Sequence, residues 1–292
     1  MSTPFRWDIT KREQLGKLVE GEAEEPYPEF LTDLQQCCAR VFSFCDNADL
    51  IFVGRSPESI YDYLSGLLAG TSWSNRICLL NISLRYYTIS EIEEELPTGL
   101  AATYEQLEET NLAPSQIVRR SRPIALTDLV ASGSTLGNLT ELLMRWLEDE
   151  RGDLTALREK LRYVGITRKK DSGKHTNRWQ QDVSWTQSFR KSRIKNVAIP
   201  WRLWGYLGNE QKKVTDSNPP WVWGKSELQS SPRHENYFQA LRLARHLYQL
   251  GLTRKHRLAF SNQLAKQPGV KFSWFRSLIA ELRQCKSSRV KC

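Results

Sequence analysis

The 292-residue sequence lacks any long apolar run. No stretch approaches the ~20 consecutive apolar residues of a membrane-spanning helix. The N-terminus also lacks the apolar segment of a signal peptide. We therefore expect a cytoplasmic protein that makes no use of a membrane.

The sequence also lacks the spacings of a metal site. Its six cysteines include no CxxC pair, and its four histidines show no metal-ligand spacing. Cys37, Cys38 and Cys78 fall in apolar segments. We expect buried free thiols, and the spacing argues against a zinc site.

What the chain does contain is an alternation of short apolar runs with segments of helical spacing. The runs start near Leu50, Ile77, Ile124 and Tyr163, and the helical segments lie near 58–69, 102–112 and 136–149. This alternation predicts an α/β fold with a doubly wound parallel sheet. Ligands of such sheets bind at the carboxyl ends of the strands, so the turns after the strands are the first places to look for a site.

The turn after the third run is the most informative. Ile124–Leu126 reads as a buried strand, Ser132-Gly133-Ser134-Thr135 as a small-residue turn, and Leu136–Leu147 as a helix. Backbone N–H groups and hydroxyls at a helix N-terminus favour a phosphate. Asp128 can accept hydrogen bonds from sugar hydroxyls beside it. The pattern indicates a sugar phosphate, and an ordinary strand-to-helix connection is the alternative.

These residues resemble the signature of the type I phosphoribosyltransferases, which is a hydrophobic strand, two acidic residues and a Thr-Gly-x-Thr loop. Thr127 stands in place of the first acid, Asp128 matches the second, and Ser132 replaces the first Thr. The resemblance covers roughly residues 30–170. It implies that the substrate is phosphoribosyl pyrophosphate with Mg²⁺ held mainly by the ligand, and that a nitrogen acceptor displaces pyrophosphate. Thr127 and Asp128 would bind the ribose, and Ser132, Gly133, Ser134 and Thr135 the 5′-phosphate.

A second turn follows the run Asp49–Val53. In the family the corresponding loop binds pyrophosphate, and Gly54, Arg55 and Ser56 stand at that place. Arg55 offers a bidentate charge to an anion, and Gly54 lets the backbone approach closely. The resemblance thus makes Arg55, with Asp128, a catalytic candidate. Alternatively, Ser56 and Glu58 form the N-terminal cap of the next helix.

The net charge of +9 is concentrated in residues 168–195, which hold nine Lys and Arg against two Asp. Trp179, Trp185 and Phe189 are interleaved with them. Cations attract phosphates and aromatic rings stack on bases, so this segment is a candidate for binding DNA or RNA. The candidate contacts are Lys169, Lys170, Arg190 and Lys191. A solvated loop is the alternative.

The remaining chain divides by composition. We expect an N-terminal arm over 1–27, the α/β core of phosphoribosyltransferase type over 28–170, a basic, Trp-rich, hood-like region over 171–228, and a small C-terminal helical extension over 229–292. In the family, the hood supplies a ring that stacks on the base, and Trp201 is similar in kind. A small satellite core of tryptophans is the alternative.

Two functions remain open from the sequence. One is transfer of a phosphoribosyl group. The other is a noncatalytic regulator of the same fold that binds a nucleotide ligand and a nucleic acid or protein partner, which Thr127 and the basic segment favour. A homodimer is compatible with either function.

Overall fold

A five-stranded, all-parallel sheet forms the centre of the molecule, with the strand order β2-β1-β3-β4-β5. The structure is a computed structural model, and it describes residues 4–169, 178–225, 230 and 234–284. The strands are β1 (Asp49–Val53), β2 (Ile77–Leu80), β3 (Ile124–Leu129), β4 (Leu161–Arg168) and β5 (Ile194–Ile199).

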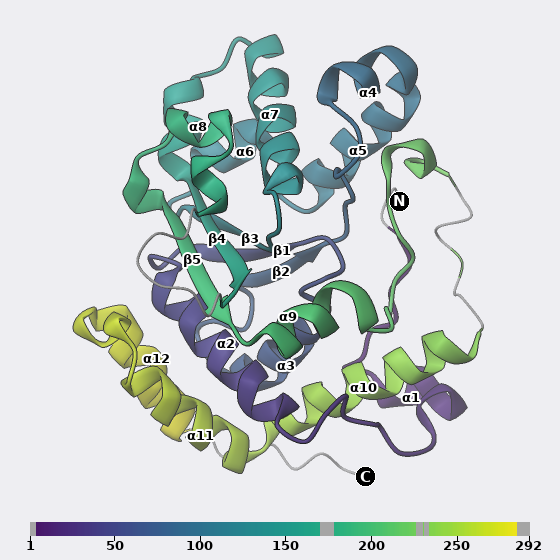
Figure 1. Cartoon of the computed structure of the whole chain (residues 1–292), viewed down its shortest axis with the longest axis vertical. Coiled ribbons are helices and arrows are strands. Elements are labelled where there is room, and N and C mark those ends of the chain that lie inside the picture. Colours follow the sequence, from purple (N-terminus) through teal and green to yellow (C-terminus); the bar gives the residue numbers. More distant parts are fainter. Residues whose placement is uncertain (1–3, 170–177, 226–229, 231–233, 285–292) are drawn as a thin grey trace.

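Helices cover both faces of this sheet, which confirms the predicted α/β fold (Figure 1). On one face lie α2 (Phe30–Phe44) and α3 (Glu58–Leu68). On the other lies α7 (Ser134–Asp149), flanked by α6 (Pro114–Arg119) and α8 (Leu154–Lys160). Both faces of the central strands are therefore buried, and these strands read as continuous apolar runs.

The connection between β2 and β3 is helical throughout much of its length. It contains α4 (Ile89–Glu95) and α5 (Pro97–Glu109) before α6. A capping box fixes the start of α4, because the Thr88 hydroxyl accepts from the Glu91 N–H and the Glu91 carboxylate accepts from the Thr88 N–H.

The fifth strand comes from the region that the sequence assigned to the hood. β5 pairs with β4 from Tyr163–Ile194 to Arg168–Ile199, so residues 194–199 belong to the core sheet. The chain reaches β5 through three short helical turns, η2 (Trp179–Gln181), η3 (Ser184–Ser188) and η4 (Lys191–Arg193). After β5 come α9 (Trp201–Gly205), η5 (Tyr206–Glu210) and η6 (Pro220–Val222).

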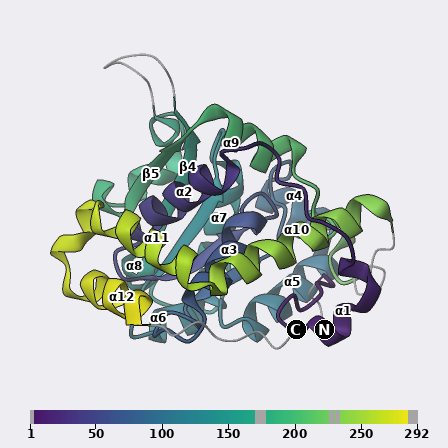
Figure 2. The same ribbon diagram turned by 90° about the horizontal axis from the view of Figure 1, so that it is seen from below.

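The predicted C-terminal helices are present as α10 (Glu235–Leu252), α11 (Arg254–Ala265) and α12 (Ser273–Gln284), with the turn η8 (Pro268–Lys271) between the last two. They pack beneath α2 and α3 (Figure 2). A Cβ on Gly66 would lie 2.0 Å from the Tyr248 carbonyl oxygen, so α3 and α10 cross in direct backbone contact. Phe260 and Phe275 are buried in the same core as α2. The helical extension is thus part of the main core.

The N-terminal arm packs on α10 and α3. It contains α1 (Arg12–Leu15) and η1 (Gly16–Val19), and Ile9 and Leu15 join the apolar side of α10. Arg6 forms an ion pair with the buried Asp62 carboxylate of α3 at 2.6 Å. The arm is therefore fixed to the helix that follows β1.

Within the described ranges, no helix combines the length and apolar character needed to cross a bilayer. Cys37, Cys38 and Cys45 are buried free thiols, and burial raises the pKa of each well above its usual range. The cysteines at 285 and 292 lie outside the described residues.

Candidate functional site at the carboxyl edge of the sheet

Asp128 lies near the carboxyl end of β3 as a buried carboxylate, with 8% of its surface exposed. Burial raises its pKa to about 7, against the opposing effects of the Leu129 N–H, which donates to Oδ1 at 2.7 Å, and of the Lys213 charge. In the described chain no cation lies within salt-bridge distance of this carboxylate. A buried acid with a raised pKa at a strand end is a candidate for a functional residue.

The turn after β3 leads into an uncapped helix. Gly133 is the N-cap of α7 with a left-handed φ of +85° and has no side chain to cap the helix, and the Ser132 hydroxyl accepts a long 3.5 Å hydrogen bond from the Ser134 N–H. Ser132 is exposed, whereas Ser134 and Thr135 are half-buried in the first turn. The first N–H groups of a helix have no intrahelical acceptor, so this turn offers donors to an anion.

Thr127 contributes nothing accessible to this site. It is fully buried, and its hydroxyl lies 3.3 Å from the Ala125 carbonyl oxygen. Successive side chains of a strand point to opposite faces, so Thr127 and Asp128 diverge. The residue that replaces the family's first acid therefore offers no atom to a ribose in this conformation.

Trp179 packs directly on the turn after β3. A Cβ on Gly133 would lie 2.5 Å from its Cε3, and a Cβ on Gly165 of β4 would lie 2.8 Å from its Nε1. The indole N–H donates to Asn196 Oδ1 at 2.6 Å. Gly165 is the ladder partner of both Asp128 and Asn196. The two glycines thus make room for a ring that fixes the turn beside Asp128.

The turn after β1 lies next to the turn after β3. Phe52 pairs with Thr127 in the parallel ladder, so the chain leaves both strands at the same level, about 5 Å apart. Gly54 has a φ of +75° and donates its N–H to the Leu80 carbonyl at 2.8 Å. Arg55 donates through Nη1 to the Thr215 carbonyl at 3.1 Å. The register therefore places the backbone of Gly54 near the carboxyl end of β3, and the Arg55 side chain is directed to the segment around Thr215.

The alternative that Ser56 and Glu58 cap α3 is wrong. Pro57 occupies the N-cap position, and the helix has no side-chain cap. The Glu58 carboxylate is buried and accepts instead from the Val214 N–H at 3.0 Å and from the Thr215 hydroxyl. The N-terminus of α3, like that of α7, is left without a capping side chain.

The residues that meet Glu58 belong to an extended segment that sequence reasoning missed. We call residues 211–218 the strap. It crosses from η5 past β1 and β2 toward η6 (Figure 1). Asn81 donates to the Asp216 carbonyl, and Asn218 donates to the Asn81 carbonyl, at 2.9 and 3.0 Å. Lys213 of the strap is half-buried, and no local sequence pattern distinguishes it from its exposed neighbour Lys212.

Trp201, the candidate for stacking on a base, is 66% exposed directly after the carboxyl end of β5. β5 lies two strands from β3, which places the ring on the same edge of the sheet, roughly 10 Å across it. Trp223 is buried, whereas Trp221 is 46% exposed. Trp223 packs in the main core on the α7 face of the sheet, so a separate satellite core accounts for neither Trp223 nor the exposed Trp201.

The aromatic residues of the basic segment do not face solvent. Trp179 and Phe189 are buried and Trp185 is half-buried, and all three pack into the core on the α7 face. The expectation that they stack on nucleic-acid bases is therefore wrong. Lys169, Arg190 and Lys191 are exposed, but Arg193 is buried and bound to Glu159. Lys170 lies outside the described residues.

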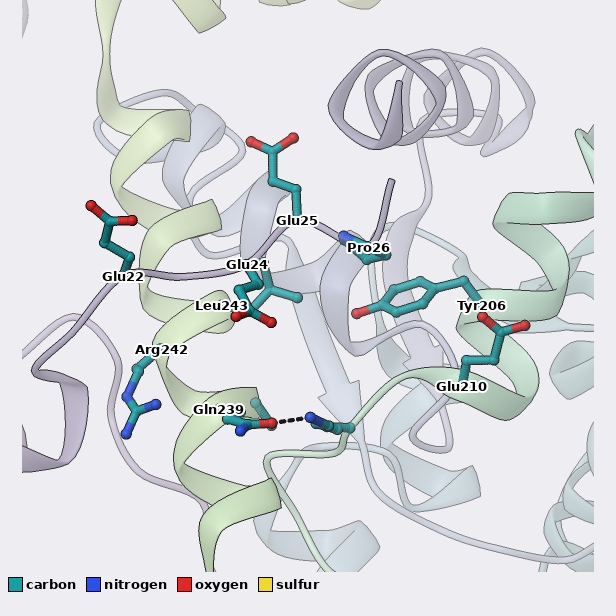
Figure 3. Close-up of a pocket in the computed structure, with 11 residues that line it drawn as sticks. Glu22, Glu24, Glu25, Pro26, Tyr206, Glu210, Gln239, Arg242 and Leu243 are labelled. Atoms are coloured by element: carbon teal, nitrogen blue, oxygen red, sulfur yellow. Dashed lines mark hydrogen bonds between the residues drawn. The ribbon is translucent and has the colours of Figure 1, made fainter. Parts of the chain in front are cut away.

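A separate pocket of about 260 Å³ lies between the N-terminal segment, η5 and α10 (Figure 3). Four of its eleven lining residues are acidic, namely Glu22, Glu24, Glu25 and Glu210. Lys212 is also part of this lining and is bound to Gln239. The pocket contains none of the site residues predicted from the sequence. Lys212 lines it, whereas the neighbouring Lys213 bonds to the carbonyls of Arg55 and Leu207 instead.

The carboxyl edge does not provide a protein cage for a metal. Within the described residues, no group of three or more His, Cys, Asp or Glu side chains could hold an ion. Mg²⁺ keeps several waters and binds through one or two carboxylates together with substrate phosphates. Asp128, a carboxylate without an ion-pair partner in the described chain, could therefore contact Mg²⁺ that is bound mainly by a phosphorylated ligand.

Comparison of the chain with models of protein families, with curated proteins and with solved structures gave no match in any of the three.

Proposed function

We propose that the carboxyl edge of the sheet binds phosphoribosyl pyrophosphate and that the fold is of the phosphoribosyltransferase type. One observation carries the proposal. Asp128, a buried carboxylate with no ion-pair partner in the described chain, lies between an uncapped helix N-terminus after its own strand and Arg55 after the neighbouring strand. A sugar with hydroxyls at its centre and an anionic group on each side matches this order of donors and acceptors.

In this proposal each group has one task. Ribose hydroxyls donate to Asp128, and the 5′-phosphate accepts from the turn Ser132–Thr135. The pyrophosphate accepts from Arg55 and Ser56 beside Gly54, whose own N–H is bonded to the Leu80 carbonyl. Mg²⁺, when bound, neutralises charge on the pyrophosphate. Trp201 offers an exposed ring for the acceptor base.

The reaction that follows is transfer to a nitrogen acceptor. The lone pair of the acceptor nitrogen forms a bond to C1 of the ribose. The bond from C1 to the pyrophosphate oxygen breaks, pyrophosphate leaves with the electron pair, and the proton of the nitrogen passes to water. Asp128 and Arg55 are the catalytic candidates because they would hold the sugar and the leaving group while charge separates.

Release of pyrophosphate from phosphoribosyl pyrophosphate tests the reaction. We expect release with a suitable member of a panel of purine and pyrimidine acceptors. Thr135→Ala should weaken binding of the substrate by about tenfold, as expected when roughly one charge-assisted hydrogen bond is removed. Ser188→Ala, an exposed serine outside the site, is the matched control. Undiminished turnover by Asp128→Asn would sink the assignment.

The second candidate, a noncatalytic regulator that binds a nucleic acid, relies on the exposed cations alone, since the aromatic rings are buried. We expect labelled RNA or DNA to be retained only at low salt. Replacing Lys169, Arg190 and Lys191 by Ala should reduce the slope of log affinity against log salt by about one for each phosphate that these side chains neutralise. Arg254→Ala on α11 is the control. An unchanged slope would exclude this surface.

A further inference from the structure

The strap places Lys213 beside Arg55. Lys213 Nζ donates to the Leu207 carbonyl at 2.9 Å and to the Arg55 carbonyl at 3.3 Å. Arg55 in turn donates to the Thr215 carbonyl, two residues further along the strap. The turn after β1 and the strap are thus held together by bonds in both directions, with two cationic side chains between them.

Neither cation has an acidic partner. Among the described residues, no carboxylate oxygen lies within 4 Å of Lys213 Nζ or of the Arg55 guanidinium. The nearest acidic residue on α3, Glu58, is engaged by the strap itself. The pKa of Lys213 is lowered to about 8, chiefly by burial and less by the Arg55 charge, whereas the Glu58 and Asp128 carboxylates act in the opposite direction.

Arg55 and Lys213 are both half-buried, so two neighbouring positive charges without a carboxylate partner repel each other, and an anion between them relieves this repulsion. The surrounding backbone is also suited to an anion, because Gly54 has a left-handed φ and α3 begins without a capping side chain. The arrangement therefore favours a ligand with more than one negative charge at this position, rather than a single phosphate.

We propose that Lys213 is the second cation of the pyrophosphate site, and that with Arg55 it selects a diphosphate over a monophosphate. This inference rests on the proposed function and assigns one half of that site. The Glu58 carboxylate accepts a hydrogen bond from the strap at Val214. This contact brings the Lys213 ammonium to the Arg55 carbonyl, although the two residues lie 158 positions apart in the sequence. The 5′-phosphate would bind elsewhere, at the turn after β3.

Calorimetric titration with inorganic pyrophosphate, and separately with ribose 5-phosphate, tests this assignment. Lys213→Met removes the charge and keeps most of the side-chain volume. We expect it to weaken pyrophosphate binding by about tenfold to hundredfold, because one charge-assisted hydrogen bond is removed. Ribose 5-phosphate should bind to it as to the wild type. Thermal melting confirms that the variant is folded.

Lys213→Arg is the matched control because it keeps the charge and cannot lose its proton. It should retain pyrophosphate binding, and its affinity at pH 9 relative to pH 7 should exceed that of the wild type, in which the lysine is deprotonated. A role in packing alone would not produce this difference.

The outcomes separate the two proposals. If the wild type binds ribose 5-phosphate and Lys213→Met keeps its affinity for pyrophosphate, the role of Lys213 is wrong and the proposed function stands. If the wild type binds neither ligand, both are wrong. If Lys213→Met fails to bind both ligands while it remains folded, the assignment of Lys213 to the pyrophosphate alone is overturned.

Discussion

Asp128→Asn is expected to stabilise the protein at pH 8 while it abolishes binding of the phosphoribosyl ligand. The pKa of Asp128 is raised to about 7 by burial, whereas an unfolded aspartate titrates near 4. Between these values the folded protein holds a proton that the unfolded chain releases. The favourable contribution of Asp128 protonation to the free energy of unfolding is therefore complete below about pH 4 and is lost as the pH rises through 7.

Above pH 7 the folded protein must bury a charged carboxylate, which costs free energy. Asparagine removes this cost because it is uncharged and nearly isosteric with aspartate. We expect the free energy of unfolding of Asp128→Asn to exceed that of the wild type by up to about 4 kcal/mol at pH 8. The difference should largely disappear at pH 4. Urea denaturation at both values measures it, with the exposed Asp182→Asn as control. A variant that is less stable than the wild type at pH 8 would show that the Asp128 carboxylate is not destabilised by burial.

Trp179→Ala is expected to cost about 3–5 kcal/mol of stability, the range for truncating a large buried aromatic residue. Its indole fills the space above Gly133 and Gly165 and donates to Asn196. Removing it leaves a cavity beside the turn after β3 and an unpaired amide oxygen. The same variant should weaken binding of ribose 5-phosphate, because the turn that we propose as the phosphate site is no longer supported.

Trp221→Ala is the control for this prediction because Trp221 is half-exposed and lies away from the turn. It should cost roughly 1 kcal/mol or less. Chemical denaturation of both variants gives the comparison. Equal destabilisation by the two substitutions would contradict the account in which Trp179 belongs to the core and not to a nucleic-acid surface.

The strands β1, β2, β3 and β4 could be predicted because each forms a short apolar run followed by a turn. β5 could not be recognised as a core strand in the same way. β2 and β5 are both edge strands, but β2 is a wholly apolar run, whereas Lys195 and Asn196 are partly exposed in β5 and interrupt its apolar pattern. Its polar composition, with the tryptophans that follow, favoured a separate region.

The prediction that the aromatic rings of the basic segment face a nucleic acid was wrong for a related reason. Its aromatic and cationic residues alternate along the chain, and sequence alone does not say which set faces inward. In the structure Trp179 and Phe189 fill the space over β4 and β5, and cations such as Arg190 remain in water. Burial of the rings contributes more free energy than their exposure could, so packing decides the orientation.

The sequence predicted the candidate residues near the strand ends, but it did not predict Lys213. Asp128 lies at the carboxyl end of β3, and Gly133 and Arg55 lie in the turns after β3 and β1, where local pattern and topology coincide. Lys213 reaches the site only because Glu58, far away in the sequence, binds the strap through Val214 and Thr215. An interaction that depends on long-range packing leaves no periodic signal along the chain.

Calorimetric titration of the wild type with the magnesium complex of phosphoribosyl pyrophosphate tests the central claim most directly. We expect one ligand per chain, with binding abolished in Asp128→Asn and weakened in Thr135→Ala although both variants remain folded. Absence of binding by the wild type, or equal binding by all three proteins, would contradict a phosphoribosyl site at the carboxyl edge of the sheet.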